Sequence, residues 1–204
     1  EIAGVDERIA EMDLMGIDVM LVSPVPTQFN YAAEPVLGQE GAQIVNDGIA
    51  DMIARRPDRL LALGTVPLQD TEMAIAELER CMGPLGMKGI EIGAGVRDEE
   101  LSAERLEPFW ARVEALGAFV LLHPTAFASE RLSAHYLTNV IGNPLETTVA
   151  ALHLVLDGVL ERYPRLRIML AHGGAYATAY AARADHAWGA RPDCRGRLER
   201  PPSE

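Results

Sequence analysis

Two hydrophobic runs in this chain each end in a histidine: Ala118-Phe119-Val120-Leu121-Leu122-His123-Pro124 and Arg167-Ile168-Met169-Leu170-Ala171-His172-Gly173-Gly174. Each run predicts a buried parallel strand that places an imidazole in the loop at its carboxyl end. In α/β proteins, ligands and metals bind at that edge of the sheet. The shared pattern therefore predicts that His123 and His172 belong to one site.

Five short apolar runs have the length of strands, and helical patterns lie between them. The strands are predicted over residues 19–23, 60–65, 89–93, 118–123 and 167–172. Strands that alternate with helices predict a parallel sheet with right-handed crossovers. The apolar stripes that predict the helices are Ile44, Ile49, Met52 and Ile53; Ala74, Leu78, Cys81 and Met82; Leu106, Phe109, Trp110, Val113 and Leu116; and Leu145, Val149, Leu152, Leu156, Val159 and Leu160.

The segment Asn143-Pro144-Leu145-Glu146 predicts the beginning of the last of these helices. Asparagine is a common N-cap, proline suits the first helical position, and a glutamate three residues after the cap completes a capping box. We therefore expect Asn143 to cap this helix and Glu146 to serve as the capping acid.

Two α/β architectures fit this alternation, an open doubly wound sheet and a (β/α)₈ TIM barrel. Periodicity does not separate them. A full barrel typically needs about 250 residues, so five strand and helix units in 204 residues would form an incomplete one. Nothing in the sequence calls for a second domain, and we expect residues 1–204 to form a single one.

Composition and charge argue against several classes of protein. The net charge of −12 argues against a nucleic-acid surface, and an anionic substrate would need a local arginine to hold it. No apolar stretch approaches the ~20 residues of a membrane span. Cys81 and Cys194 are isolated thiols without a Cys-x-x-Cys spacing, which indicates a reducing compartment, and we expect a cytoplasmic location.

The two strand-end histidines suit two kinds of chemistry. Neutral imidazole is a common ligand of zinc, and with a pKa near ~6.5 it is also a general base. A catalytic metal usually has three protein ligands, so His123 and His172 alone would not complete such a site. The alternative for each ring is a structural role, with a backbone carbonyl as its partner.

Three other side chains are candidates for substrate contact. Arg183 lies in the predicted helix over residues 180–186, where a planar guanidinium would suit a substrate carboxylate; the alternative is a solvated surface arginine. Phe29 and Asn30 belong to the loop after the first predicted strand and would suit a pocket wall. A plain proline-rich loop is the alternative there.

A series of short motifs resembles the amidohydrolase-related, metal-dependent decarboxylases. The resemblance covers residues 6–193 approximately, and the order and spacing of the motifs make it specific. The motifs are Ser23-Pro24-Val25-Pro26 with Phe29-Asn30-Tyr31; Leu63-Gly64-Thr65-Val66-Pro67-Leu68-Gln69; Glu79-Arg80-Cys81; Gly89-Ile90-Glu91-Ile92-Gly93; His123-Pro124; Glu146-Thr147-Thr148; Tyr163-Pro164-Arg165-Leu166; Ala171-His172-Gly173-Gly174; and Arg191-Pro192-Asp193.

The resemblance implies a (β/α)₈ barrel with one divalent ion, usually zinc, at its carboxyl-terminal mouth. The five predicted strands match the second to the sixth of that barrel. His123 matches the metal ligand on the fifth strand, and His172 matches a base on the sixth that hydrogen-bonds the metal-bound water. Arg183 matches an arginine that reaches a substrate carboxylate in the neighbouring subunit, so we expect a homodimer.

The activity implied is the metal-dependent, oxygen-independent decarboxylation of a small unsaturated or aromatic carboxylic acid, a carbon–carbon lyase reaction. Hydrolysis or hydration by the same metal site is an alternative. A non-catalytic fragment with an incomplete metal site is another. The sequence lacks the His-x-His pair that the family carries on its first strand, and Ala175 stands where the family has a third glycine after His172.

Overall fold

The computed structural model describes residues 4–125, 127 and 129–204. The chain forms two compact units, Glu1–Glu91 and Ile92–Glu204. The single domain expected over residues 1–204 stays a prediction. Across the described residues, every helix is too short or too polar to cross a membrane.

The first unit contains parallel strands, as the sequence predicts. β1 (Met20–Val22) pairs with β2 (Leu60–Gly64), and β2 pairs with β3 (Gly89–Ile92). All three lie within the predicted ranges. Because parallel neighbours need a crossover, a helix lies between each pair of these strands in the chain.

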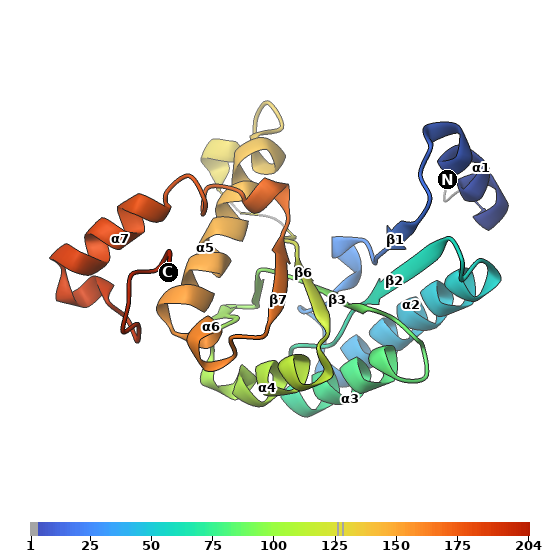
Figure 1. Cartoon of the computed structure of the whole chain (residues 1–204), viewed down its shortest axis with the longest axis horizontal. Helices are drawn as coiled ribbons and strands as arrows, with labels where there is room; N and C mark the ends of the chain where they lie inside the picture. Colours follow the sequence, from blue (N-terminus) through green and yellow to red (C-terminus); the bar gives the residue numbers. More distant parts are fainter. Residues whose placement is uncertain (1–3, 126, 128) are drawn as a thin grey trace. The chain divides into compact units, whose positions relative to one another are not determined.

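The α-helices among the described residues of the first unit are α1 (Val5–Met15), α2 (Pro35–Arg55) and α3 (Thr71–Met82). α2 and α3 contact each other and β2 (Figure 1). The stripe predicted for α2 is wrong at Ile44, which is 74% exposed. The stripe is confirmed at Ile49, which is buried together with Gly38, Ala42 and Asn46. Asn46 can be buried on this face because its amide is hydrogen-bonded there.

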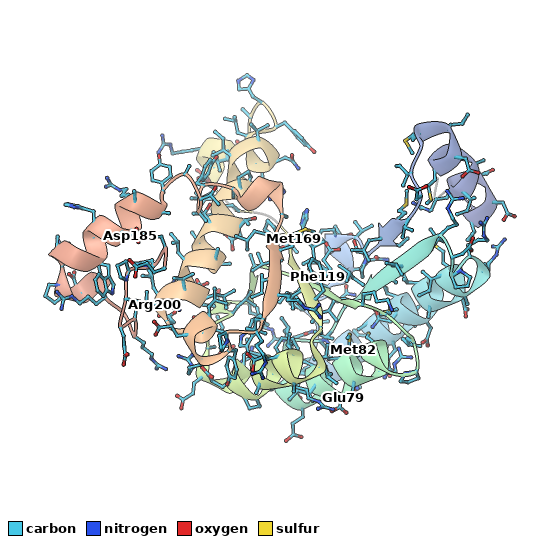
Figure 2. All side chains as sticks on the ribbon, viewed as in Figure 1. Glu79, Met82, Phe119, Met169, Asp185 and Arg200 are labelled. Atoms are coloured by element: carbon cyan, nitrogen blue, oxygen red, sulfur yellow. The ribbon has the colours of Figure 1, made fainter. Side chains whose placement is uncertain are left out.

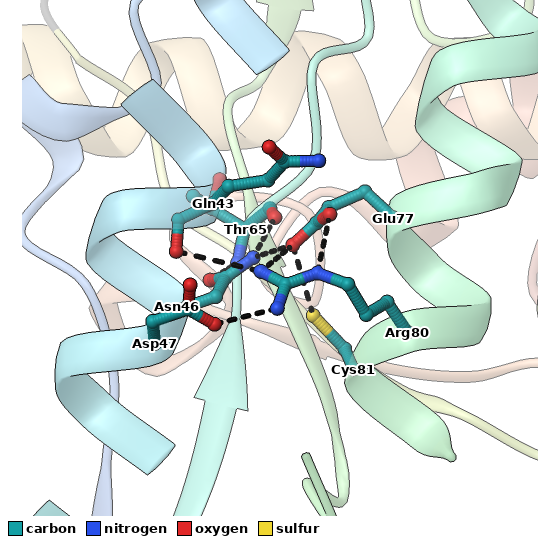
Figure 3. Close-up of polar contacts among 7 residues, drawn as sticks. All are labelled: Gln43, Asn46, Asp47, Thr65, Glu77, Arg80 and Cys81. Carbon is teal, nitrogen blue, oxygen red and sulfur yellow. Dashed lines mark hydrogen bonds and ion pairs between the residues drawn. The ribbon is translucent and has the colours of Figure 1, made fainter. Parts of the chain in front are cut away.

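A buried polar network joins α2, α3 and the end of β2 (Figure 3). The amide of Asn46 donates to the Thr65 carbonyl and to Glu77, and it accepts from the Thr65 backbone N–H. Arg80 donates hydrogen bonds to both carboxylate oxygens of Glu77, from Nε and from Nη2. Its Nη1 donates to Asp47 on α2. Glu77 and Asn46 are therefore buried with charge and hydrogen bonds compensated.

The second unit contains the parallel pair β6 (Phe119–Leu122) and β7 (Arg167–Leu170), in register from Phe119 with Arg167 to Leu122 with Leu170. Both strands lie within the predicted ranges and pair in parallel, but the predicted burial is wrong for β7, whose residues alternate between exposed and partly buried. Met169 on β7 is 44% exposed, and Figure 2 labels it. An antiparallel pair, β4 (Gly95–Val96) and β5 (Glu99–Glu100), was not predicted, because each strand is only two residues long.

The helices of the second unit lie where the stripes predict them, but the last stripe is wrong as a buried face. Of its residues only Val159 is buried and Leu160 is 37% exposed, whereas α5 buries Thr147, Thr148, Ala150, Ala151 and Leu154. α4 (Glu107–Leu116) buries Phe109, Trp110 and Val113, as predicted. The last stripe divides into α5 (Asn143–Leu156) and α6 (Val159–Arg162), because Gly158 between them has a left-handed φ of 74°. Figure 1 shows α5 alongside β7. The short helical turns are Pro26–Gln28, Glu104–Leu106, Glu130–Leu132, His172–Gly174 and Pro192–Cys194 as 3₁₀ turns, and Thr138–Gly142 as a π turn.

The predicted N-cap of α5 is wrong. Asn143 has helical dihedrals, φ −61° and ψ −46°, and no side-chain cap bond is present at this end of α5. The π-helical turn Thr138–Gly142 runs directly into α5, so the backbone is already helical before Asn143. A residue in helical conformation does not act as an N-cap, and Glu146 does not act as a capping acid.

The helix α7 (Ala181–Ala190) follows the loop after β7. It is tied to the last residues of the chain, because Ser203 donates to Asp185 from both its backbone N–H, at 3.0 Å, and its hydroxyl, at 2.6 Å. Figure 2 labels Asp185 on α7 and Arg200 on the final segment.

Candidate active site

His123 and His172 lie together at the carboxyl ends of β6 and β7. The register that pairs Leu122 with Leu170 brings the two following segments side by side, and the Ala171 N–H donates to the Leu122 carbonyl at 3.0 Å. The two imidazole rings are 5.0 Å apart between centroids and inclined by 59°. The expectation that the two strand ends share one site is therefore consistent with the geometry.

His123 is held at its backbone and at one ring nitrogen. Its N–H donates to the Ile92 carbonyl at 2.9 Å. Its Nδ1 lies 2.8 Å from the Pro124 carbonyl oxygen, which can only accept, so Nδ1 carries the proton. In the neutral ring Nε2 is then the nitrogen without a proton, and this is the arrangement that a metal-binding histidine adopts.

His172 begins a loop with an unusual backbone. Its φ is 58°, Gly173 and Gly174 follow with φ of 64° and 80°, and Ala175 has φ 51° with ψ −130°. Its Nδ1 contacts the hydroxyl of Thr147 on α5 at 3.1 Å. Burial lowers the pKa of His172, and the positive charge of a protonated His123 lowers it further. The ring is therefore neutral at pH 7, as a general base must be.

Arg183 lies on α7 and lines a cleft of about 720 Å³ within the second unit. Apolar side chains of α5 and α7 form much of the wall, and neither His123 nor His172 is among the described residues that line it. Among the described residues, Arg183 and the two histidines therefore do not line the same cleft. The polar groups that share this cleft with Arg183 are Thr148, His153, Asp157, Tyr176, Tyr180, Asp193 and Cys194.

Phe29 and Asn30 lie in the first unit. Phe29 is 2% exposed and stacks on Tyr31, with 5.7 Å between ring centroids, so its ring belongs to the core of this unit. Asn30 is exposed with a left-handed φ of 55°, and its Nδ2 donates to the Gln28 carbonyl at 2.9 Å. Gln69 donates to the Asn30 carbonyl at 3.0 Å, which fixes the loop. Their assignment to substrate binding stays a prediction.

Only part of a metal site is visible in the described residues. Within residues 4–125, 127 and 129–204, no group of three or more His, Cys, Asp or Glu side chains could hold a metal ion. The donor chemistry of His123 fits one ligand position, because its Nε2 is left free by the bond at Nδ1. The sequence agrees with an incomplete ligand set, since it has no His-x-His pair.

Thr147 contacts a site histidine but is not among the residues predicted for the site. Its motif, Glu146-Thr147-Thr148, resembles the family, but we interpreted Glu146 as a capping acid and assigned no role to the threonines. The one signal available was a pair of polar residues between the apolar positions Leu145 and Val149 of a predicted helix. Thr147 is fully buried and touches His172.

Comparison with known proteins identifies one family and a set of longer relatives. The amidohydrolase family model matches residues 2–199. The chain is 37% identical over 189 residues to a 2-amino-3-carboxymuconate-6-semialdehyde decarboxylase of Dictyostelium discoideum, covering 92% of this chain and 53% of that one. The crystal structure of 2,6-dihydroxybenzoate decarboxylase from Rhizobium is 31% identical, with a TM-score of 0.88 over 96% of this chain and 64% of that one.

A second solved structure carries information on the metal. The dihydroxybenzoic acid decarboxylase from Polaromonas sp. JS666 holds manganese and the inhibitor 2-nitroresorcinol; it is 28% identical, with a TM-score of 0.86 over 97% of this chain and 63% of that one. The chain thus spans between about half and two thirds of the length of these relatives. The similarity confirms the predicted fold class, an α/β fold of the (β/α)₈-barrel type present in part.

Proposed function

Because the chain belongs to the amidohydrolase family, we propose that it serves in a metal-dependent, oxygen-independent decarboxylase of a small unsaturated or aromatic carboxylic acid. The observation that carries the proposal is the contact between the rings of His123 and His172, with 5.0 Å between their centroids. One imidazole is then available for a metal and its neighbour for a proton. The decarboxylases among the relatives support the class of reaction.

In this proposal His123 gives one ligand to a divalent ion through its free Nε2. A divalent cation in such a site polarises a substrate oxygen and lowers the pKa of bound water. We propose zinc as that ion, since the family resemblance implies it. The manganese in the Polaromonas structure is the alternative, and metal analysis of the purified protein decides between them.

His172 carries the proton in this proposal. Decarboxylation breaks the bond between the carboxylate carbon and its neighbouring carbon, and the electron pair stays on that neighbour while carbon dioxide leaves. The neighbouring carbon then needs one proton. We assign the transfer of this proton to Nε2 of His172, since Nδ1 faces Thr147. Nε2, unprotonated in the neutral ring, first takes a proton from solvent and then gives it to that carbon. General acid–base catalysis of this kind contributes ~10²–10⁴-fold to rate.

Arg183 is proposed to bind a substrate carboxylate in a neighbouring subunit of a homodimer. Arg183 is exposed on α7, and the cleft that it lines does not include His123 or His172 of its own chain among its described residues, which supports an action on another copy. Sedimentation analysis tests the dimer. Mixing the inactive Arg183→Ala and His172→Gln variants tests whether Arg183 acts in the site of the other subunit, because a mixed dimer would then have one intact site. If a verified mixed dimer shows no recovery of activity, Arg183 does not act across the dimer.

Phe29 and Asn30 are proposed to contribute to the wall of the substrate site. Because Phe29 is buried, its replacement would also disturb the core, and Asn30 is the better probe. Asn30→Asp keeps a short polar side chain that tolerates the left-handed backbone. A rise in KM for the acid substrate, with metal content unchanged, is expected; unchanged kinetics would remove Asn30 from the site.

The decisive experiment compares two histidine variants. In His123→Ala the bound divalent metal, measured by elemental analysis, is expected to fall. In His172→Gln the metal is expected to remain, and carbon dioxide release from 2,6-dihydroxybenzoate or 2-amino-3-carboxymuconate-6-semialdehyde to fall by ~10²–10⁴-fold. His186→Gln, an exposed position on α7, is the control. Full activity in both site variants overturns the assignment, and substrate loss without carbon dioxide release indicates hydrolysis or hydration.

We also propose a cytoplasmic location. The two cysteines, buried Cys81 and partly buried Cys194, are both free thiols, which supports a reducing compartment. Fractionation of cells that express the protein, followed by immunodetection, tests the location.

A further inference from the structure

Two consecutive threonines of α5 hold the loop that follows β7. Thr147 Oγ1 lies 3.1 Å from Nδ1 of His172, and Thr148 Oγ1 accepts from the Tyr176 backbone N–H at 3.0 Å. Both threonines are buried. Because α5 lies alongside β7 (Figure 1), the helix contacts the loop at its first residue and again four residues later.

Thr148 shows how each hydroxyl is used. A hydroxyl has one proton to donate and lone pairs that accept. Thr148 lies 2.8 Å from the Pro144 carbonyl, four residues earlier, which can only accept, so the hydroxyl proton points there. Its oxygen is then an acceptor, and the Tyr176 N–H, which can only donate, supplies the second bond.

Thr147 has the same arrangement one position earlier. Its Oγ1 lies 3.1 Å from the Asn143 carbonyl, four residues before it, and this oxygen also can only accept. If the hydroxyl instead donated to His172, its oxygen would face the Asn143 oxygen with lone pairs opposed, in a position with no access to water. Both contacts are attractive only when Nδ1 of His172 carries a proton.

We propose that Thr147 is a positioning residue that holds neutral His172 as its Nδ1–H tautomer and so leaves Nε2 unprotonated. The use of that nitrogen in proton transfer rests on the proposed function, but the tautomer does not. His123 shows the same preference by a different route, because its Nδ1–H binds the Pro124 carbonyl. The paired rings would then both present an unprotonated Nε2, one as ligand and one as base.

Nitrogen NMR of the 204-residue chain labelled with ¹⁵N-histidine tests the tautomer directly. At about pH 8 neutral imidazole dominates, and the ring nitrogens of each tautomer have distinct shifts and couplings. The His172 signals are assigned by their loss in His172→Gln. We expect a protonated Nδ1 and an unprotonated Nε2. A proton on Nε2 of His172 in the wild-type spectrum overturns the proposal, whatever the variants do.

Three variants test whether Thr147 causes the preference. Thr147→Val keeps the shape and removes the hydroxyl, so we expect the His172 signals to move toward the Nε2–H tautomer. Thr147→Ser restores the hydroxyl and should restore the wild-type pattern. Thr148→Val is the matched control, which should free the Tyr176 amide to faster exchange and leave the tautomer unchanged. A pure Nδ1–H tautomer in folded Thr147→Val contradicts the role of Thr147.

Kinetics separate this inference from the proposed function. With a substrate that releases carbon dioxide, Thr147→Val is expected to lose about 10–100-fold in kcat, as removal of a partner of a site histidine typically does, with KM nearly unchanged. Thr147→Ser should recover most of that loss. If the wild-type protein releases no carbon dioxide, the proposed function fails, and the NMR result still decides the tautomer.

Discussion

Asn46 and Thr65 are joined by two hydrogen bonds of 2.8 Å, one in each direction, between the side-chain amide on α2 and the backbone at the end of β2. Through these two bonds the side-chain amide pairs with the Thr65 backbone in the way that a residue of a neighbouring strand would. The same amide donates at 2.6 Å to Glu77, whose second oxygen binds Arg80. The direction of the chain as it leaves β2 is thus set by a helix side chain.

Replacing Asn46 with alanine should destabilise the protein by about 3 kcal/mol. The variant would remove the Asn46 bonds to the buried N–H and carbonyl of Thr65, and each such loss costs ~1–3 kcal/mol. Glu77 would keep both of its bonds to Arg80. Asp47→Ala is the matched control on the same helix, because Asp47 is 59% exposed and its ion pair with Arg80 should contribute about 1 kcal/mol or less. Urea unfolding followed by circular dichroism measures both, and equal losses would contradict the network.

The two cysteines should differ strongly in reactivity. Burial, and after it the charge of Glu77, raises the pKa of Cys81 to about 12. Since the thiolate is the reactive form, Cys81 should not react with a disulfide reagent at pH 8, whereas the partly exposed Cys194 should. Titration should count one thiol in the native protein and two in urea. Cys194→Ser should show none before unfolding; rapid labelling of that variant would disprove the burial of Cys81.

Ala175→Gly should stabilise the protein by roughly 1 kcal/mol. Ala175 has φ 51° and ψ −130°, a combination that strains any residue with a Cβ and suits glycine. The adjacent Gly174, with φ 80°, provides the opposite control, because Gly174→Ala should destabilise the protein through backbone strain. A steric clash would not contribute, since the added Cβ would contact only Thr178, at an ordinary 3.4 Å. Thermal melts measure both, and a lower Tm for Ala175→Gly would refute the strain.

Glu146 should make stability depend on pH. Burial, followed by the charge of Glu100, raises the pKa of Glu146 above its ordinary 4.5. The folded state therefore binds this proton more tightly than the unfolded state, and the stabilisation is complete below the unfolded pKa and is lost as pH rises through the folded one. Glu146→Gln should thus be more stable than wild type at pH 7, by on the order of 0.5 kcal/mol after solvent screening, and equal to it near pH 4.

Glu100→Gln provides the control for the charge contribution. It removes the like charge that disfavours ionised Glu146, so it should give a smaller gain at pH 7 than Glu146→Gln. The double variant should gain less than the sum of the two, because both act on one interaction. Denaturant unfolding at pH 4 and pH 7 measures all three, and a gain that does not change with pH would contradict the raised pKa.

The sequence predicted the strands better than the ends of the helices. Runs such as Phe119–Leu122 and Ile168–Leu170 are apolar over a length that favours a strand, and both form strands in the structure. The start of α5 was mispredicted because Asn143 and Pro144 fit a capping motif, whereas a π-helical turn already precedes them. Local signals do not show whether the backbone before a helix is already helical.

The candidate site was predictable in its histidines and not in their partners. Strand-end position is a property of the sequence, and parallel register then brings His123 and His172 together. Thr147 meets His172 across 25 residues through the packing of α5 on the loop, and no pattern in the chain specifies that contact. The burial of Asn46 was not predicted for a related reason. An apolar stripe does not indicate which polar residue is buried, and Asn46 is buried because its amide is hydrogen-bonded inside the unit.

The unpaired edge of β7 affects how the chain behaves in solution. β6 pairs with one edge of β7, and over the described residues no strand pairs with its other edge. Backbone groups on such an edge, beside an apolar side chain like Met169, can recruit a strand from another molecule. Concentrated solutions of this chain should therefore become turbid on standing, and Met169→Lys should delay the turbidity by placing a charge on that strand.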